Sequence, residues 1–331
     1  MGVRGQIIGA RPIYWVFLWG MKNVKYYLAA ITASTIWGFF SFVLRPLAAW
    51  SSVDILFYRV FTSAVLLLIT SALLRTAARK AARRVYTALS AGDKRGLVRQ
   101  VLGGGLFLTA NWFFFIFVLN HRSIKAASLA YLVCPILTTV LAWLILKERL
   151  SRGQWVAVGM SVCGCLLLAF HHLVDLLYSL VIAVSYAFYL ISQRKNYGID
   201  KFLLLTVQVA FSALLLLPFY PIYRGPVPTV ALFYILIGVI AIFFTIIPLW
   251  LSLFALQRLK SSTVGVILYI NPLLGFVIAV TCYGEKVRLA EGIAYGVIVL
   301  SVILFNVMNP ALKEPPAAPA PDFSGRNAPG H

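Results

Sequence analysis

Two prolines lie inside long apolar runs at positions that correspond to each other. Pro135 lies near the middle of the run 124–146, and Pro272 takes the equivalent place in the run 262–283. A proline removes a backbone donor and clashes with the preceding turn, so each helix should kink and free a carbonyl. Paired interruptions in two halves of a membrane protein are typical of a substrate site at the bilayer midplane. Packing kinks without ligand contact are the alternative.

Polar and aromatic side chains near these prolines are candidates for contact with a substrate. Tyr and Asn can direct hydrogen bonds at a ligand, whereas their burial against lipid is costly. A neighbouring run adds a buried Asn and a Trp that is either a stacking platform or core. The candidates for substrate contact are Asn111, Trp112, Ser128, Tyr131, Tyr269 and Asn271.

Arg59 is the basic residue well inside an apolar run, 53–74. A charge within a membrane helix is a functional hypothesis by default. If Arg59 faces a cavity, it favours an anionic substrate group or an acidic partner such as Glu285 or Asp54. The alternative is that its long side chain reaches back to the membrane interface. We include Arg59 among the predicted substrate-binding residues.

Glu148 and Glu285 end the two proline-containing runs, and each has a cation beside it. They are predicted to face opposite sides of the membrane. One interpretation is a symmetric pair of gating charges that exchange partners as a cavity opens to either side. Simple anchoring at the membrane interface is the other.

The composition defines the elements that must position these residues. Of 331 residues, 61% are hydrophobic and 11% are charged, which a water-soluble fold of this size could not hide in one core. The chain is therefore predicted to be an all-α membrane protein with ten transmembrane helices. Runs of spanning length occur at 26–44, 54–74, 98–119, 124–146, 153–170, 173–192, 202–220, 229–255, 262–283 and 289–308.

The stretch 119–168 occurs twice in the chain. A shift of 137 positions places it on 256–305, with Pro135 on Pro272 and Glu148 on Glu285. The match indicates a doubled unit. Since each half holds five helices, an odd number, the second half must enter the membrane from the opposite side. The repeats are predicted to be inverted about an axis in the membrane plane.

The distribution of basic residues predicts the orientation. Lys and Arg number 22 on the side of the N-terminus and 6 on the other side. Because basic loops stay cytoplasmic, both termini are placed inside. The net charge of +20 thus reflects topology, and nucleic-acid binding is not expected. The basic segment 76–99 is either a surface helix on anionic lipid or a solvated helical loop.

Little in the sequence supports a disulfide framework, a metal site or catalysis. The four cysteines lie in apolar segments, so neither a disulfide framework nor a metal site is expected. The adjacent histidines 171 and 172 have no other ligands nearby and make a poor metal site. No cofactor motif and no catalytic machinery is visible, so the chain is predicted not to be an enzyme.

Four segments are expected along the chain. Residues 1–21 form an N-terminal extension, and translation is hypothesised to begin at Met21. Residues 22–170 form the first repeat and 171–308 the second. The composition then changes to Pro, Ala and Gly, so 309–331 is expected to be a disordered cytoplasmic tail.

Several short motifs together resemble the RarD branch of the EamA-type drug/metabolite transporter superfamily. The resemblance spans about Lys22 to Met308. It departs from the family at Cys134, where members often have Asn before the proline. The motifs are Asn111-Trp112-Phe113, Ala127 to Tyr131, Lys147 to Leu150, Gln154-Trp155, Leu268 to Pro272, Tyr283 to Lys286, and Asp54 to Leu56 with Arg59.

The resemblance implies two inverted EamA repeats, a bacterial inner-membrane location, and export or exchange of a small metabolite or drug. We therefore predict a secondary transporter that works by alternating access at a midplane site. Its partners are a small-molecule substrate and the lipid bilayer, and no oligomeric state is implied. The alternatives are a non-transporting membrane scaffold and a membrane enzyme that acts on lipid-linked substrates.

Overall fold

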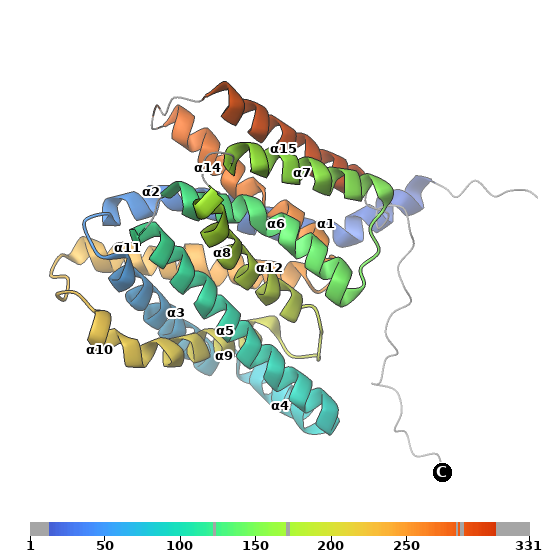
Figure 1. Ribbon diagram of the computed structural model, residues 1–331. Coiled ribbons are helices and arrows are strands. Elements are labelled where there is room, and N and C mark those ends of the chain that lie inside the picture. Colours follow the sequence, from blue (N-terminus) through green and yellow to red (C-terminus); the bar gives the residue numbers. More distant parts are fainter. Residues whose placement is uncertain (1–12, 122–123, 170–172, 283, 285–287, 309–331) are drawn as a thin grey trace, which may run out of the picture.

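The structure is a computed structural model that describes residues 13–121, 124–169, 173–282, 284 and 288–308. These residues form helices and contain no strand, as Figure 1 shows. The helices are α1 (Ile13–Gly38), α2 (Phe40–Leu44), η1 (Arg45–Leu47), α3 (Ser52–Leu74), α4 (Thr76–Ala88), α5 (Ala91–His121), α6 (Ile124–Leu146), α7 (Arg152–Ala169), α8 (Leu173–Ser192), α9 (Lys201–Leu216), η2 (Leu217–Phe219), α10 (Tyr220–Tyr223), α11 (Ala231–Ala241), η3 (Ile242–Ile246), α12 (Ile247–Ala255), α13 (Ser261–Ile267), α14 (Ile270–Thr281) and α15 (Leu289–Val307).

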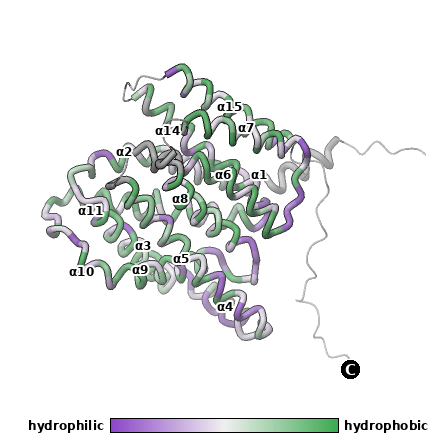
Figure 2. Tube along the Cα trace, in the orientation of Figure 1, coloured by the Kyte–Doolittle hydropathy of each residue, from purple (hydrophilic) through white to green (hydrophobic). Residues whose placement is uncertain are grey.

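The chain is a multi-pass membrane protein. Within the described residues, six helical stretches are long and apolar enough to cross a bilayer. Shorter apolar stretches lie in α6, α7 and α8. Figure 2 shows that hydrophobic residues predominate along the helices of the bundle, and many large apolar side chains are exposed. Every apolar run predicted from the sequence falls on one helix or on consecutive helical segments. The prediction of an all-helical membrane fold is therefore confirmed.

The two predicted kinks differ from each other. Pro135 lies inside α6, which continues through it without interruption. Helix α13, by contrast, ends at Ile267, and α14 begins at Ile270, just before Pro272. Pro272 has no N–H to offer the carbonyl of Leu268, and the Asn271 N–H donates to that carbonyl instead, at 3.1 Å. The Leu268 carbonyl is thus satisfied by a backbone N–H of the same chain segment.

A third proline marks an interruption that the sequence interpretation did not include. Pro248 lies at the start of α12, directly after the π-helical segment η3. It cannot donate to the carbonyl of Phe244, four residues earlier. The indole Nε1 of Trp37, on α1, donates to that carbonyl at 3.0 Å. A side chain from the first half of the chain therefore satisfies a backbone group of the second half.

Close approaches between helices come from the two halves of the chain. Helices α7 and α15 run side by side (Figure 1), as do α6 and α8, α3 and α9, and α1 and α12. A Cβ added at Gly265 on α13 would lie 2.8 Å from Cγ2 of Thr138 on α6. The absence of a side chain at Gly265 therefore permits α13 and α6 to pack directly.

A buried glutamine network joins α5, α8 and α9. The Nε2 atom of Gln208 donates to Oε1 of Gln193 at 3.0 Å and to the carbonyl of Gln100 at 3.1 Å. A Cβ at Gly104 would lie 2.4 Å from that Nε2 atom, so the network needs a glycine there. Amide pairs of this kind hold membrane helices together where apolar contacts with lipid would be equally favourable.

We expect Gly265→Ala to destabilise the protein by about 1–2 kcal/mol, since overpacking against Thr138 outweighs the helix propensity gained. Thermal unfolding in detergent measures the effect. Gly275→Ala is the matched control on α14, because a Cβ there meets nothing within 4 Å. Equal melting temperatures for the two variants would contradict the packing assigned to Gly265.

Candidate substrate site

Arg59 lies inside the helical bundle among residues of three other segments. Its Nε donates to Oγ1 of Thr245 at 2.9 Å. Its guanidinium carbon lies 5.0 Å from the ring centre of Trp112 and 5.8 Å from that of Phe40. Such cation–π contacts are attractive, and more so where water is displaced. The structure therefore encloses Arg59 rather than directing it to the membrane interface.

The π-helical segment positions the partner of Arg59. Thr245 lies in η3, and its Oγ1 donates to the carbonyl of Ile240 at 3.0 Å. The same oxygen also accepts a hydrogen bond from the Nε–H of Arg59. Single π turns inside α-helices are frequent at functional sites. The local geometry of η3 thus orients the guanidinium group.

The two Nη groups of Arg59 make no hydrogen bond or ion pair with any residue in the described part of the chain. The side chain is partly accessible although protein surrounds it. Asp54, a predicted acidic partner, is engaged elsewhere, because its Oδ1 accepts the Gly225 N–H at 2.9 Å. Glu285, the other predicted partner, lies outside the described residues. The guanidinium fork is free to bind an anion.

Aromatic residues continue the site beyond Arg59. Tyr131 on α6 lies within electrostatic range of both Arg59 and Tyr186. The Tyr186 ring lies 6.1 Å from that of Trp37 and 5.7 Å from that of Tyr189. Among the described residues, the buried hydroxyl groups of Tyr186 and Tyr189 have no hydrogen-bond partner of good geometry, although Ser252 lies near that of Tyr186. Unpaired buried hydroxyls are costly and are available to a ligand.

The structure brings three predicted residues together and places others elsewhere. Arg59, Trp112 and Tyr131 share the aromatic site. Asn111 is turned toward α8, where its Nδ2 donates to the carbonyl of Ile182 at 3.0 Å. Asn271 is partly exposed at the interrupted helix. Ser128 lies in α6, but its side chain is outside the described part of the structure.

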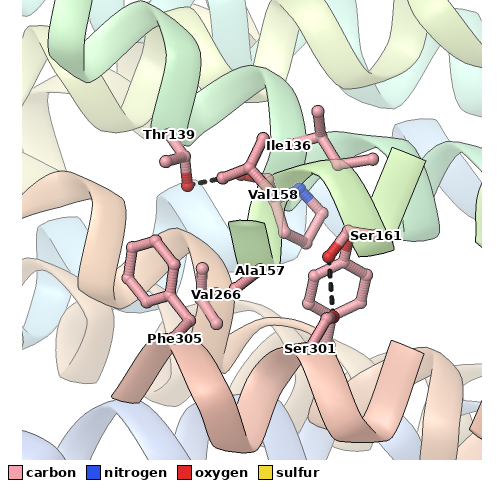
Figure 3. Close-up of a pocket in the computed structure, with 10 residues that line it drawn as sticks. Ile136, Thr139, Ala157, Val158, Ser161, Val266, Ser301 and Phe305 are labelled. Carbon is pink, nitrogen blue, oxygen red and sulfur yellow. Dashed lines mark hydrogen bonds between the residues drawn. The ribbon is translucent and has the colours of Figure 1, made fainter. Parts of the chain in front are cut away.

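Tyr269 belongs to a second group of residues, shown in Figure 3. It lines a cavity of about 10 Å³ with Pro135, Thr139 and residues of α7 and α15. This volume accommodates about one water molecule. The Tyr269 hydroxyl is buried without a hydrogen-bond partner, and the hydroxyls of Ser161 and Ser301 lie 2.7 Å apart nearby. The cavity is too small for an organic substrate in this conformation.

Glu148 joins the two halves of the chain. Its carboxylate accepts the Ser261 N–H at 2.8 Å, the Ser262 N–H at 3.1 Å and the Ser262 hydroxyl at 2.6 Å. These groups begin α13, where a carboxylate is stabilising. Nε of Arg194, at the end of α8, lies 4.0 Å from Oε1 of Glu148. We call Glu148, Arg194, Ser261 and Ser262 the Glu148 clasp.

The chain turns sharply to form this clasp. Lys147 has φ 56°, a left-handed conformation that is uncommon for a residue with a side chain. The Glu148 N–H then donates to the carbonyl of Ala142 at 3.2 Å and closes the end of α6. Glu285, the predicted counterpart at the other end, is outside the described residues.

We expect Glu148→Ala to lower stability by about 2–4 kcal/mol, because it leaves two buried N–H groups without their acceptor and removes the carboxylate beside Arg194, whose Nη1 still donates to the Leu256 carbonyl. Glu148→Gln keeps an acceptor and should cost less. Thermal unfolding in detergent compares them with Asp93→Ala, which removes a half-exposed carboxylate whose partners, Ser90 and Lys195, lie at the surface. A Glu148→Ala protein as stable as Asp93→Ala would refute the clasp.

Sequence interpretation missed Thr245, Trp37 and Phe40. Pro248 was the available signal, because a proline inside the run 229–255 predicts a disturbed helix one turn earlier. That turn contains Thr245, a polar residue in an apolar run. No comparable signal pointed to Phe40, which is one of many aromatic residues.

The comparison with family models identifies the class of protein. The model described as the EamA-like transporter family matches residues 24–170 and again residues 174–307. The chain therefore belongs to the EamA-like transporter family.

Named relatives define the branch. A protein named RarD from Salmonella typhimurium is 32% identical over 292 residues, covering 84% of this chain and 93% of the relative. An "Uncharacterized transporter" from Vibrio cholerae is 31% identical over 293 residues, covering 85% and 91%. The resemblance to RarD-type drug/metabolite transporters is thereby confirmed, and the chain is a membrane transporter of that type.

A solved crystal structure has the same fold. It matches with a TM-score of 0.68 and covers 86% of this chain and 98% of its own. Its sequence identity of 19% supports the fold alone.

Proposed function

We propose that the protein is a secondary transporter that moves a small organic anion across the bacterial inner membrane by alternating access. The proposal rests on the enclosed guanidinium group of Arg59. Thr245 binds its Nε, and its two Nη groups have no hydrogen-bond or ion-pair partner among the described residues. A cation in a membrane interior is costly unless it has a partner. A carboxylate or phosphate of the substrate would be that partner, and Trp112 and Tyr131 would contact its apolar part.

Contacts between α7 and α15 support two inverted repeats. Ser161 meets Ser301, and Gly164 approaches Ile298. The shift of 137 positions carries Ser161 to Ile298 and Gly164 to Ser301, so each contact is the image of the other. The paired positions also run in opposite directions along the two helices, as expected for inverted elements.

Helices α3 and α9 show the same relation. Near the start of α3, Asp54 accepts the N–H of Gly225, which follows α10. At the start of α9, Asp200 lies 4.0 Å from Arg75, which follows α3. Each half thus supplies an Asp at the start of one helix that meets the far end of its partner. Ten spanning helices in two inverted halves would produce this reciprocal pair of contacts.

The excess of basic residues supports cytoplasmic termini, and the Glu148 clasp then lies at the cytoplasmic end. The clasp joins the repeats there, whereas the Asp54–Gly225 contact joins them at the opposite end. In alternating access, the contacts at one end of the molecule break while those at the other end stay formed. Glu148 accordingly acts as a gating residue, and we propose the same role for Glu285 by the repeat relation.

The roles of the remaining predicted residues follow from their placement. Ser128 and Asn271, on the two proline-containing helices, are kept as candidate substrate contacts. Asn111 and Tyr269 would act by holding the helices that carry the site. Neither a cofactor nor a catalytic step is part of this function.

Arg59→Gln should reduce counterflow of anionic substrates in proteoliposomes by at least about tenfold, since a charge-assisted bidentate contact contributes about 1.5–3 kcal/mol. Arg59→Lys should retain part of the activity, because lysine keeps the charge but not the fork. A screen of carboxylates, phosphates and neutral drugs such as chloramphenicol measures both. Arg152→Gln, on an exposed residue, is the control, and unchanged anion counterflow by Arg59→Gln would refute the proposed site.

The clasp should govern access from its own end. We expect Ser261→Cys, in a background without the native cysteines, to react slowly with a membrane-impermeant maleimide, because Ser261 is fully buried. Its backbone N–H, which binds Glu148, is unchanged by this substitution. Adding Glu148→Gln should accelerate labelling several-fold by weakening closure. Equal rates would show that Glu148 does not gate this end.

A further inference from the structure

Helix α4 carries a cluster of positive charge outside the apolar bundle. Its residues Arg79, Lys80, Arg83 and Arg84 are all exposed, and we call them the basic face. Ala78, Ala82, Val85 and Leu89 are less exposed and form the side turned to the rest of the protein. Figure 2 shows α4 as one of the most hydrophilic helices of the molecule. The basic face is therefore available to a partner outside the chain.

The basic face lies just beyond the end of a membrane-spanning helix. Leu73 and Leu74, the last residues of α3, are 70% and 77% exposed. They continue a lipid-facing apolar surface that includes Leu68 and Ile69. At about 1.5 Å per helical residue, the stretch from Leu74 to Lys80 spans roughly 9 Å and that from Leu74 to Arg84 roughly 15 Å. The headgroup layer is about 5–8 Å thick on each side of the hydrocarbon core, so the long side chains of the basic face start just beyond it and can reach back to its phosphates.

Nearby acids do not neutralise the basic face. Asp93 accepts a hydrogen bond from the hydroxyl of Ser90 and lies 3.2 Å from Nζ of Lys195. These two contacts hold the pKa of Asp93 below its usual range, the Ser90 bond contributing most. Asp200 faces Arg75 at 4.0 Å. Both carboxylates are therefore already paired with cations other than those of the basic face.

Within the basic face, Arg79 is held by the protein and the others are not. Nη2 of Arg79 donates to the carbonyl of Ala72 at 2.7 Å, which ties α4 to the end of α3. Lys80, Arg83 and Arg84 form no ion pair with any described residue. Their charges are exposed and have no ion-pair partner among the described residues.

We propose that the basic face of α4 binds the phosphate groups of anionic phospholipids at the membrane surface. The exposed leucines of α3 contact the acyl chains of the same lipids, and Lys80, Arg83 and Arg84 contact their headgroups. The adjoining leucines favour a lipid over a soluble polyanion, because a nucleic acid has no apolar part to cover them. Binding at this place fixes α4 relative to the bilayer.

Native mass spectrometry of the full chain, released from detergent with dioleoylphosphatidylglycerol or dioleoylphosphatidylcholine, tests the proposal. The wild-type protein should retain phosphatidylglycerol preferentially. The variant Lys80→Gln/Arg83→Gln/Arg84→Gln should bind it at least about tenfold more weakly, since each basic residue near an anionic surface contributes roughly fivefold. Melting temperatures in detergent verify that the variant is folded.

The matched control is Arg149→Gln/Arg152→Gln/Arg258→Gln, which removes three exposed charges. These residues lie at the same end of the molecule as α4, because the Glu148 clasp and the Asp93–Lys195 pair connect the loops. Phosphatidylglycerol binding by this control should stay within about twofold of wild type. An equal loss in both variants would assign binding to diffuse charge and overturn the proposal.

Two further arms separate other ligands of the same chemistry. Inorganic phosphate and a short single-stranded RNA are added as competitors at matched phosphate concentration. Neither should displace phosphatidylglycerol if the leucines contribute. Displacement by either competitor, or equal retention of phosphatidylcholine and phosphatidylglycerol, would overturn the proposal.

Discussion

In a bilayer, each backbone N–H and C=O must find its partner inside the protein, because hydrocarbon offers none. The site depends on how this constraint is met around Pro248. The carbonyl of Phe244 loses its helical donor and receives the indole N–H of Trp37 instead. The adjoining π turn aims Thr245 at Arg59. The π turn beside Pro248 thus positions the threonine that binds Arg59 of α3.

The enclosed cation sets the chemistry of the proposed site. A guanidinium group with a free fork, flanked by Trp112 and Phe40, combines strong attraction for a planar anion with contact area for an apolar group. The hydrogen bond from Nε to Thr245 orients the guanidinium group and leaves its positive charge without a counter-charge among the described residues. A protein carboxylate paired with Arg59 would stabilise it but would compete with an anionic ligand.

The two halves of the chain are joined at two places by different contacts. At one end, Glu148 binds N–H groups and a hydroxyl at the start of α13, and Arg194 lies beside it. At the other, Asp54 binds the N–H of Gly225. Both are contacts between halves of the chain, and each is a small number of polar interactions. Alternating access as proposed here would need such contacts to be exchanged between two arrangements.

The sequence by itself determined where the helices lie, since apolar length and loop charge depend on composition alone. It also indicated the family and the internal repeat, and it singled out Arg59, Trp112 and Tyr131, which the fold brings together. Only the tertiary structure decided which way the side chains turn. The helices are apolar on all sides, so periodicity does not distinguish a face toward lipid from a face toward the interior. Asn111 therefore had the same sequence signal as Trp112, yet it binds the Ile182 carbonyl on α8. Tyr269 lines a separate cavity, and Glu148 reaches α13 from the other half of the chain. Contacts between residues more than a hundred positions apart arise from helix packing, which a single sequence does not record.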